Sequence, residues 1–90
     1  MIEREAAHLV QAKETRAAAA RQRFALHILC GIDMDAVMAA RPAERRHAAG
    51  LVERRLKRER LKGLNGHWSY DLNRHIALKQ ALVWLKTQDV

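Results

Sequence analysis

The spacing of apolar residues in the first third of the chain predicts one long amphipathic helix. Residues 2–30 contain no proline or glycine and are rich in good helix formers such as Ala, Glu, Gln, Arg and Leu. At about 100° per residue, most of the apolar side chains gather on one face. This face consists of Ile2, Ala6, Leu9, Val10, Ala17, Ala20, Phe24 and Ile28. We expect Gly31 to end the helix, and the apolar turns before it to be the deepest part of the core.

Two further helices are predicted in the middle of the chain. A short helix over about 33–40 can be capped by a carboxylate, which accepts from the free backbone N–H groups of a first turn. The candidates for this cap are Asp33 and Asp35. Pro42 is tolerated at a first helical position, so a longer helix starts there and runs to about residue 62, before Gly63. The apolar stripe of this helix is narrow, and it consists of Ala48, Ala49, Val52 and Leu56, with Arg45 and Glu59 extending its line.

The last helix is predicted over about 70–86, after a loop that turns at Asn65-Gly66. Ser69 or Asp71 can cap it. It has two apolar faces, one made of Leu72, Ile76 and Val83, the other of Leu78, Ala81, Leu82 and Leu85, with Trp84 between them. The sequence therefore predicts a single all-α domain over residues 1–90. We expect a small, largely antiparallel bundle of a long N-terminal helix, a short connector helix, a basic helix and a hydrophobic C-terminal helix.

The lengths and faces of these helices favour a homodimer. A domain of 90 residues buries only a modest fraction of its surface. Because the first helix is the longest, its end around Ile2, Leu9 and Val10 should overhang the bundle. A copy related by a two-fold axis could cover this end and the second apolar face of the last helix, since an isologous contact pairs a patch with itself.

Positive charge is concentrated in the third predicted helix. The segment 41–62 holds nine bases and three acids, so it carries +6 of the chain's net +7. Two of the three acids can pair with bases on the same helix. Glu53 can reach Lys57, and Glu59 can reach Arg55 or Lys62. The bases expected to form the free positive face are Arg46, Arg54, Lys57, Arg58 and Lys62.

Three interpretations of this positive face stay open. Bases clustered along one helix are typical of a nucleic-acid binder, since each neutralised phosphate releases counterions. The segment lacks Asn, Gln, Ser and Thr, the residues that read base edges, so such binding would be to the DNA or RNA backbone and weakly specific. The alternatives are docking on an acidic surface of a larger protein, as an adaptor or inhibitor would, or a charged face that is only solvated.

A cluster of specific side chains surrounds the last loop. Its members are His67, Trp68, Tyr70, Arg74 and His75, with Asp71 and Asn73 among them. One interpretation is a recognition edge, because Trp, Tyr and Arg are over-represented at binding hot spots. The other is structural, with Trp68 and Tyr70 holding the loop against the core while Asp71 and Asn73 cap the helix. We favour the structural interpretation.

The sequence offers little for other functions. The single cysteine, Cys30, cannot form an internal disulfide, and no secretory signal pattern precedes it, which together indicate the reducing cytoplasm. We find no Cys/His cluster at metal-ligand spacing, no phosphate-binding glycine loop and no catalytic triad pattern, so we expect no metal, no cofactor and no enzymatic activity. The longest apolar run, 24–32, is too short to cross a membrane.

Overall fold

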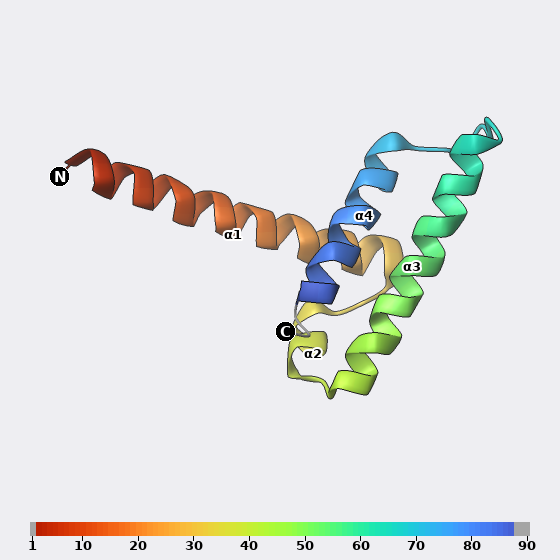
Figure 1. Cartoon of the computed structure of the whole chain (residues 1–90), viewed down its shortest axis with the longest axis horizontal. Helices are drawn as coiled ribbons and strands as arrows, with labels where there is room; N and C mark the ends of the chain where they lie inside the picture. The colour runs from red at the N-terminus through yellow and green to blue at the C-terminus, as the bar shows by residue number, and fades with distance from the viewer. Residues whose placement is uncertain (1, 88–90) are drawn as a thin grey trace.

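A computed structural model describes residues 2–87, with the side chains of residues 4–87. It contains four helices and, in this part of the chain, no strand: α1 (Ile2–Cys30), α2 (Met34–Ala39), α3 (Pro42–Leu64) and α4 (Leu72–Thr87) (Figure 1). The predicted all-α helical bundle is therefore confirmed. The helix bounds lie within two residues of those expected from the sequence.

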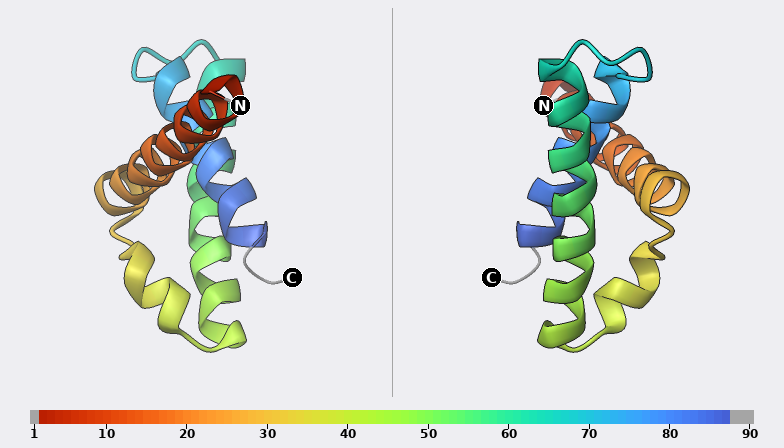
Figure 2. Two further views of the ribbon diagram at one scale, coloured as in Figure 1. Left: turned by 90° about the vertical axis from the view of Figure 1, so that its left-hand side faces the viewer. Right: turned by 90° about the vertical axis from the view of Figure 1, so that its right-hand side faces the viewer.

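The four helices form a small body from which most of α1 projects. α3 and α4 run antiparallel and lie side by side in both views of Figure 2, and α2 packs near the start of α3. α1 crosses this pair with its last turns only, while residues 4–17 are all exposed (Figure 1). The described chain measures 53 × 34 × 20 Å as a result. The expectation that α1 lies antiparallel within the bundle is wrong, because the charged side chains of its first half leave little apolar area for packing. The predicted overhang of its N-terminal end is confirmed by the exposure of residues 4–17.

The core lies where the end of α1 meets the other three helices. It is built from Leu26 of α1, Ile32, two residues of α2 and the buried faces of α3 and α4, namely Met34, Val37, Ala48, Val52, Leu56, Leu78, Ala81 and Leu85. The end of α1 enters this core through the fully buried Leu26, but most of the core comes from α3 and α4, so the prediction that this end is the deepest part is not confirmed.

The apolar face of α1 lies in solvent along the described helix, as predicted for the overhanging end but not for the last turns, where it was expected to form the core. Leu9, Val10, Phe24 and Ile28 are exposed, with Phe24 at 67%, while the side chain of Ile2 falls outside the described residues. Ala25 and Leu26 are buried, and these lie on the opposite side of the helix. The last turns of α1 are apolar nearly all round, so periodicity there could not say which side would pack.

Two glycines end helices by adopting the left-handed conformation. Gly31 has a φ of +66°, and its N–H donates to the carbonyl of His27 (3.0 Å), which closes α1 as expected. At the end of α3, Gly66 has a φ of +60°, and the N–H of His67 donates to the carbonyl of Lys62 (2.9 Å). Together with the bond from Gly66 to Gly63 (3.3 Å), this is a Schellman motif.

Gly63 does not end α3 as predicted, because the helix continues to Leu64. A Cβ at Gly63 would lie 2.9 Å from Cε2 of Tyr70, which is too close for a real contact. Gly63 therefore makes room for the Tyr70 ring against the last turn of α3. The loop that follows is held to the helix by this packing.

The caps at the starts of α2 and α4 are made by aspartates. Asp33 Oδ1 accepts from the backbone N–H groups of Asp35 (2.9 Å) and Ala36 (3.3 Å). Asp71 Oδ1 accepts from the N–H of Arg74 (3.1 Å). Of the alternatives left open by the sequence, Asp33 and Asp71 are thus the capping residues.

α4 has the two apolar faces that its sequence predicts. Leu78, Ala81 and Leu85 are buried, and Leu82 packs against the same core. The other face is open to solvent, and its residues are Leu72, Ile76 and Val83.

Candidate nucleic-acid interface

α3 turns its narrow apolar stripe inward and so presents its charged side to solvent. Ala48, Val52 and Leu56 are buried as predicted, and Ala49 packs against the same core. Because the buried positions recur every three or four residues, the residues halfway round the helix face outward. Most of the bases of α3 occupy that outward arc.

The five bases predicted to form the positive face are distributed over this arc. Arg46, Arg54, Lys57 and Arg58 are exposed, and Lys62 is half-buried. No ion pair involves any of these five among the residues that the structure describes. Arg46 and Lys62 lie about 24 Å apart along the helix axis at the usual helical rise. The positive face is therefore long, and its charges are not neutralised by neighbouring acids.

The two acids expected to neutralise part of this face do not do so. Within residues 2–87, Glu53 makes no ion pair with Lys57. Glu59 is only 3% exposed, and its Oε1 accepts from Nη1 of Arg74 in α4 (3.1 Å) rather than from Arg55 or Lys62. Glu59 continues the line of the buried stripe, so it faces α4 and not the bases on the outside of α3.

A small basic recess lies where α3, α4 and the end of α1 meet. Its volume is about 80 Å³, and its walls are Leu29, Arg55, Arg58, Glu59, Lys62, Arg74 and Leu78. The second carboxylate oxygen of Glu59, Oε2, is buried without a hydrogen-bond partner in the described structure. Four bases and one acid surround this recess, so it adds to the positive potential along the C-terminal half of α3. Sequence reasoning did not place Arg55 and Arg74 here, because the contact joins two helices.

The predicted cluster around the last loop divides into two parts, and one part is tied to the body. The Tyr70 hydroxyl lies 2.9 Å from Nδ1 of His75, and the two rings meet edge to face at 5.8 Å. Nη1 of Arg74 donates to Oε1 of Glu59. Tyr70, Arg74 and His75 therefore hold the loop and the start of α4 in place, as the structural interpretation predicts for Tyr70.

The other part of the cluster, His67 and Trp68, stands in solvent. Trp68 is 90% exposed, so the expectation that it packs against the core is wrong. Its ring stacks on that of His67, with ring centroids 5.6 Å apart and an angle of 28° between the planes. Nδ1 of His67 accepts from the backbone N–H of Ser69 (3.1 Å) and lies 2.7 Å from its hydroxyl. The space beside Gly63 is taken by the ring of Tyr70 and not by that of Trp68.

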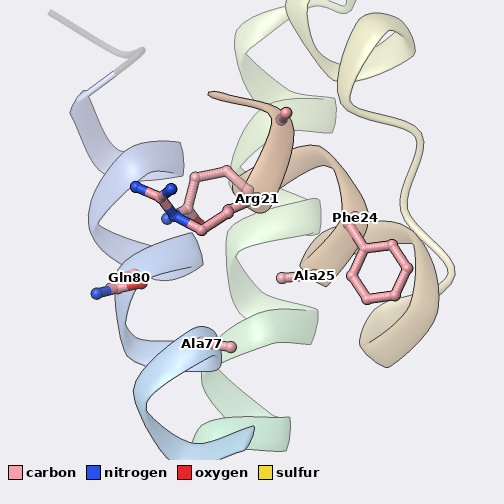
Figure 3. A pocket seen from close by; sticks show the side chains of 7 residues that line it. Arg21, Phe24, Ala25, Ala77 and Gln80 are labelled. Carbon is pink, nitrogen blue, oxygen red and sulfur yellow. The ribbon is translucent and has the colours of Figure 1, made fainter. Parts of the chain in front are cut away.

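An apolar groove runs between α1 and α4, on a different surface from the bases of α3. Its volume is about 410 Å³, and Figure 3 shows Arg21, Phe24 and Ala25 of α1 together with Ala77 and Gln80 of α4 around it. The sequence did not predict this groove, because it depends on the angle at which α1 crosses α4.

Beyond these surfaces, the described part of the chain holds one free thiol but no metal-binding group and no membrane-spanning helix. Residues 2–87 contain no group of three or more His, Cys, Asp or Glu side chains that could hold a metal ion. In the same range no helix combines the length and the apolar character needed to cross a membrane. Cys30 is a free, half-buried thiol. Burial raises the pKa of the Cys30 thiol, and the nearby positive charge of Arg55 partly offsets this effect.

Comparisons with known proteins found no matching family model, no matching curated protein and no matching solved structure. A function for this chain therefore has to be inferred from its own surfaces. The most distinctive of these are the positive face of α3 and the exposed ring pair at its C-terminal end.

Proposed function

We propose that this protein is a small non-enzymatic regulator that binds the phosphate backbone of nucleic acid through α3. The observation that carries the proposal is the row of exposed bases that have no acidic partner in the described structure, above all Arg54, Lys57 and Arg58. Along one line of a helix, residues four apart lie about 6 Å from each other, which is close to the spacing of successive phosphates on one strand. Arg54 and Arg58 stand at this spacing and Lys57 lies beside them on the exposed side of α3, so the three can neutralise several phosphates together.

The proposed binding depends on the backbone and not on the base sequence. α3 contains no Asn, Gln, Ser or Thr that could read base edges in a groove. The Arg and Lys side chains on its exposed side contact phosphates by charge. Affinity should therefore depend strongly on salt and weakly on sequence.

The test is a salt titration with a matched charge control. If three phosphates are neutralised, the slope of log K against log salt on duplex DNA is about −3. Replacing Arg54, Lys57 and Arg58 by Glu should abolish binding, while circular dichroism shows unchanged helicity because all three side chains are exposed. The control replaces Arg4, Lys13 and Arg16 of α1 by Glu, which changes the net charge equally but leaves α3 intact. Equal losses in the two variants, or binding that is flat in salt, would refute the proposal.

A second candidate function is docking of α3 on an acidic surface of a larger protein. It is favoured by two leucines near the C-terminal end of α3, Leu61 and Leu64, the latter 83% exposed. Protein interfaces surround such apolar side chains with charged ones, whereas phosphates offer them no contact. If the purified protein fails to bind DNA and RNA at low salt, and a partner retained from lysate survives nuclease treatment, this second function is favoured.

We further propose that two copies associate through the uncovered apolar faces of α1 and α4. The exposed residues on these faces include Leu9, Val10, Phe24, Ile76 and Val83. Light scattering coupled to size exclusion, at tens of micromolar protein, should give twice the monomer mass. Leu9→Glu or Val83→Glu should reduce it to the monomer mass without unfolding. Leu85, although it lies on the same helix as Val83, is 2% exposed, so Leu85→Glu would disrupt the fold and cannot serve as a test.

A further inference from the structure

The loop between α3 and α4 exposes its largest apolar side chain in a fixed position. Trp68 is 90% exposed, and the loop that carries it, between α3 and α4, lies at the end of the body away from the projecting half of α1 (Figure 1). An exposed tryptophan gives up the free energy that its burial would contribute, so a ligand that covers the ring recovers it. The proposed contacts of the dimer do not use this residue.

The ring of Trp68 is held before any ligand arrives. One of its faces stacks on His67, and the His67 ring is fixed in turn by two contacts from Ser69. The backbone on either side is fixed as well, by the left-handed Gly66 and by the packing of Tyr70 on Gly63. Because these contacts already order the loop, a ligand that stacks on the open face of Trp68 loses less conformational entropy on binding.

The helix that leads into this ring pair carries the positive face. The N–H of His67 donates to the carbonyl of Lys62, so the ring pair starts directly at the last turn of the basic helix. Arg58 lies one turn before Lys62, and both line the basic recess. The exposed ring pair therefore follows directly on the helix whose exposed side carries Arg54, Lys57 and Arg58.

We propose that His67 and Trp68 form a stacking platform for an unpaired base, and that the preferred ligand is therefore single-stranded nucleic acid. Within a duplex both faces of a base are covered by its neighbours, so only unpaired bases can stack on a side chain. Aromatic stacking tolerates every base, because each base has a flat face. Stacking that tolerates every base agrees with α3, which lacks side chains that read base edges. The inference rests on the proposed function of α3 and specifies its substrate class.

The experiment compares a labelled single strand of about 12 nucleotides with a duplex of the same sequence, by fluorescence anisotropy at one fixed salt concentration. We expect Trp68→Ala to weaken single-strand binding about tenfold and to change duplex binding by less than about twofold. Trp68→Phe, which keeps an aromatic face, should restore most of the loss. In a Trp84→Phe background, the single strand but not the duplex should quench the fluorescence of Trp68.

Two results would overturn the platform. In the first, Trp68→Ala leaves single-strand binding unchanged or weakens both ligands equally. In the second, Trp68→Ala binds both ligands as the unaltered chain does but loses an acidic protein partner, which makes the ring pair part of a protein interface. The proposed function fails separately, when the unaltered chain binds neither nucleic acid. Unchanged far-ultraviolet circular dichroism is expected for Trp68→Ala, since this side chain is 90% exposed and takes no part in the core.

Discussion

α3 and the projecting part of α1 are both amphipathic helical segments, yet only α3 buries its apolar side. In α3 the stripe of Ala48, Val52 and Leu56 is enclosed, whereas Leu9 and Val10 of α1 stand in solvent. α3 is joined by short connections to α2 and α4, so its neighbours are held against it, while α1 is anchored only at its last turns. Periodicity therefore indicates which side of a helix is apolar but not whether another element of the same chain will cover it.

The largest expected difference between the two regions is in the cost of removing an apolar side chain. Leu56→Ala should lower the free energy of unfolding by about 2–5 kcal/mol, because it leaves a cavity at a position that is 2% exposed. Leu9→Ala should change it by less than about 0.5 kcal/mol in the monomer. Urea unfolding followed by circular dichroism measures both, at a protein concentration low enough for light scattering to give the monomer mass. If both variants lose the same stability, α1 is packed along its whole length.

The ion pair between Glu59 and Arg74 gives the next largest effect. Arg74→Leu should destabilise the protein by about 3 kcal/mol, because it leaves the buried carboxylate of Glu59 without a partner. The Arg74 side chain is 39% exposed, so the effect should fall toward the lower end of those seen for buried pairs. The control Arg54→Leu removes an exposed arginine and should leave stability nearly unchanged.

A double variant separates the cost of burying an unpaired carboxylate from the loss of the arginine's packing. Replacing Glu59 and Arg74 together by Leu should recover most of the stability lost in Arg74→Leu, since two apolar side chains need no partner. A double variant no more stable than Arg74→Leu would contradict this account. It would mean that the loss came from packing of the arginine and not from the unpaired carboxylate.

The parts of the fold that sequence reasoning predicted are those set by local chemistry. Asp33, Pro42 and Gly31 act within one turn of their own position, so helix starts and the end of α1 were predicted correctly. The buried stripe of α3 was predicted because charged residues occupy most of the remaining circumference of the helix. These features require no knowledge of which elements meet.

The parts that were not predicted depend on contacts between distant residues. Gly63 was expected to end α3, but its role is to admit the ring of Tyr70. Phe24 and Trp68 were expected inside, but Leu26 and Tyr70 occupy the available positions. Of the candidate site, the exposure of the bases followed from the pattern of α3, whereas the ring pair could only be found once the loop was placed.

Substitutions that change helix propensity should affect the free energy of unfolding in α3 but not in the projecting part of α1, and by less than the changes above. Gly50 lies inside α3, where an added Cβ would meet only Nη1 of Arg54, at an ordinary contact distance of 3.7 Å. Gly50→Ala should therefore raise the free energy of unfolding by about 0.5–1 kcal/mol. Ala12→Gly in the exposed part of α1 should reduce helicity locally without moving the unfolding midpoint, because that segment can unwind without disturbing the core. A midpoint lowered by Ala12→Gly would show that α1 unfolds together with the body.

The smallest expected effect concerns Cys30, the last residue of α1, which lies at its packed end. Burial raises the pKa of this thiol above that of a free cysteine, so the folded protein holds the proton more tightly than the unfolded chain. The resulting stabilisation is fully present below the pKa of the free thiol, about 8.5, and is lost as pH rises through the folded value. Alkylation rates measured against pH should accordingly reach half their maximum at a higher pH in the folded protein than in urea. Arg55→Gln should move the folded midpoint higher still, since the positive charge that favours the thiolate is removed. A folded midpoint at or below that of the unfolded chain would mean that the last turn of α1 opens along with the rest of the helix, and that the two regions are not distinct in solution.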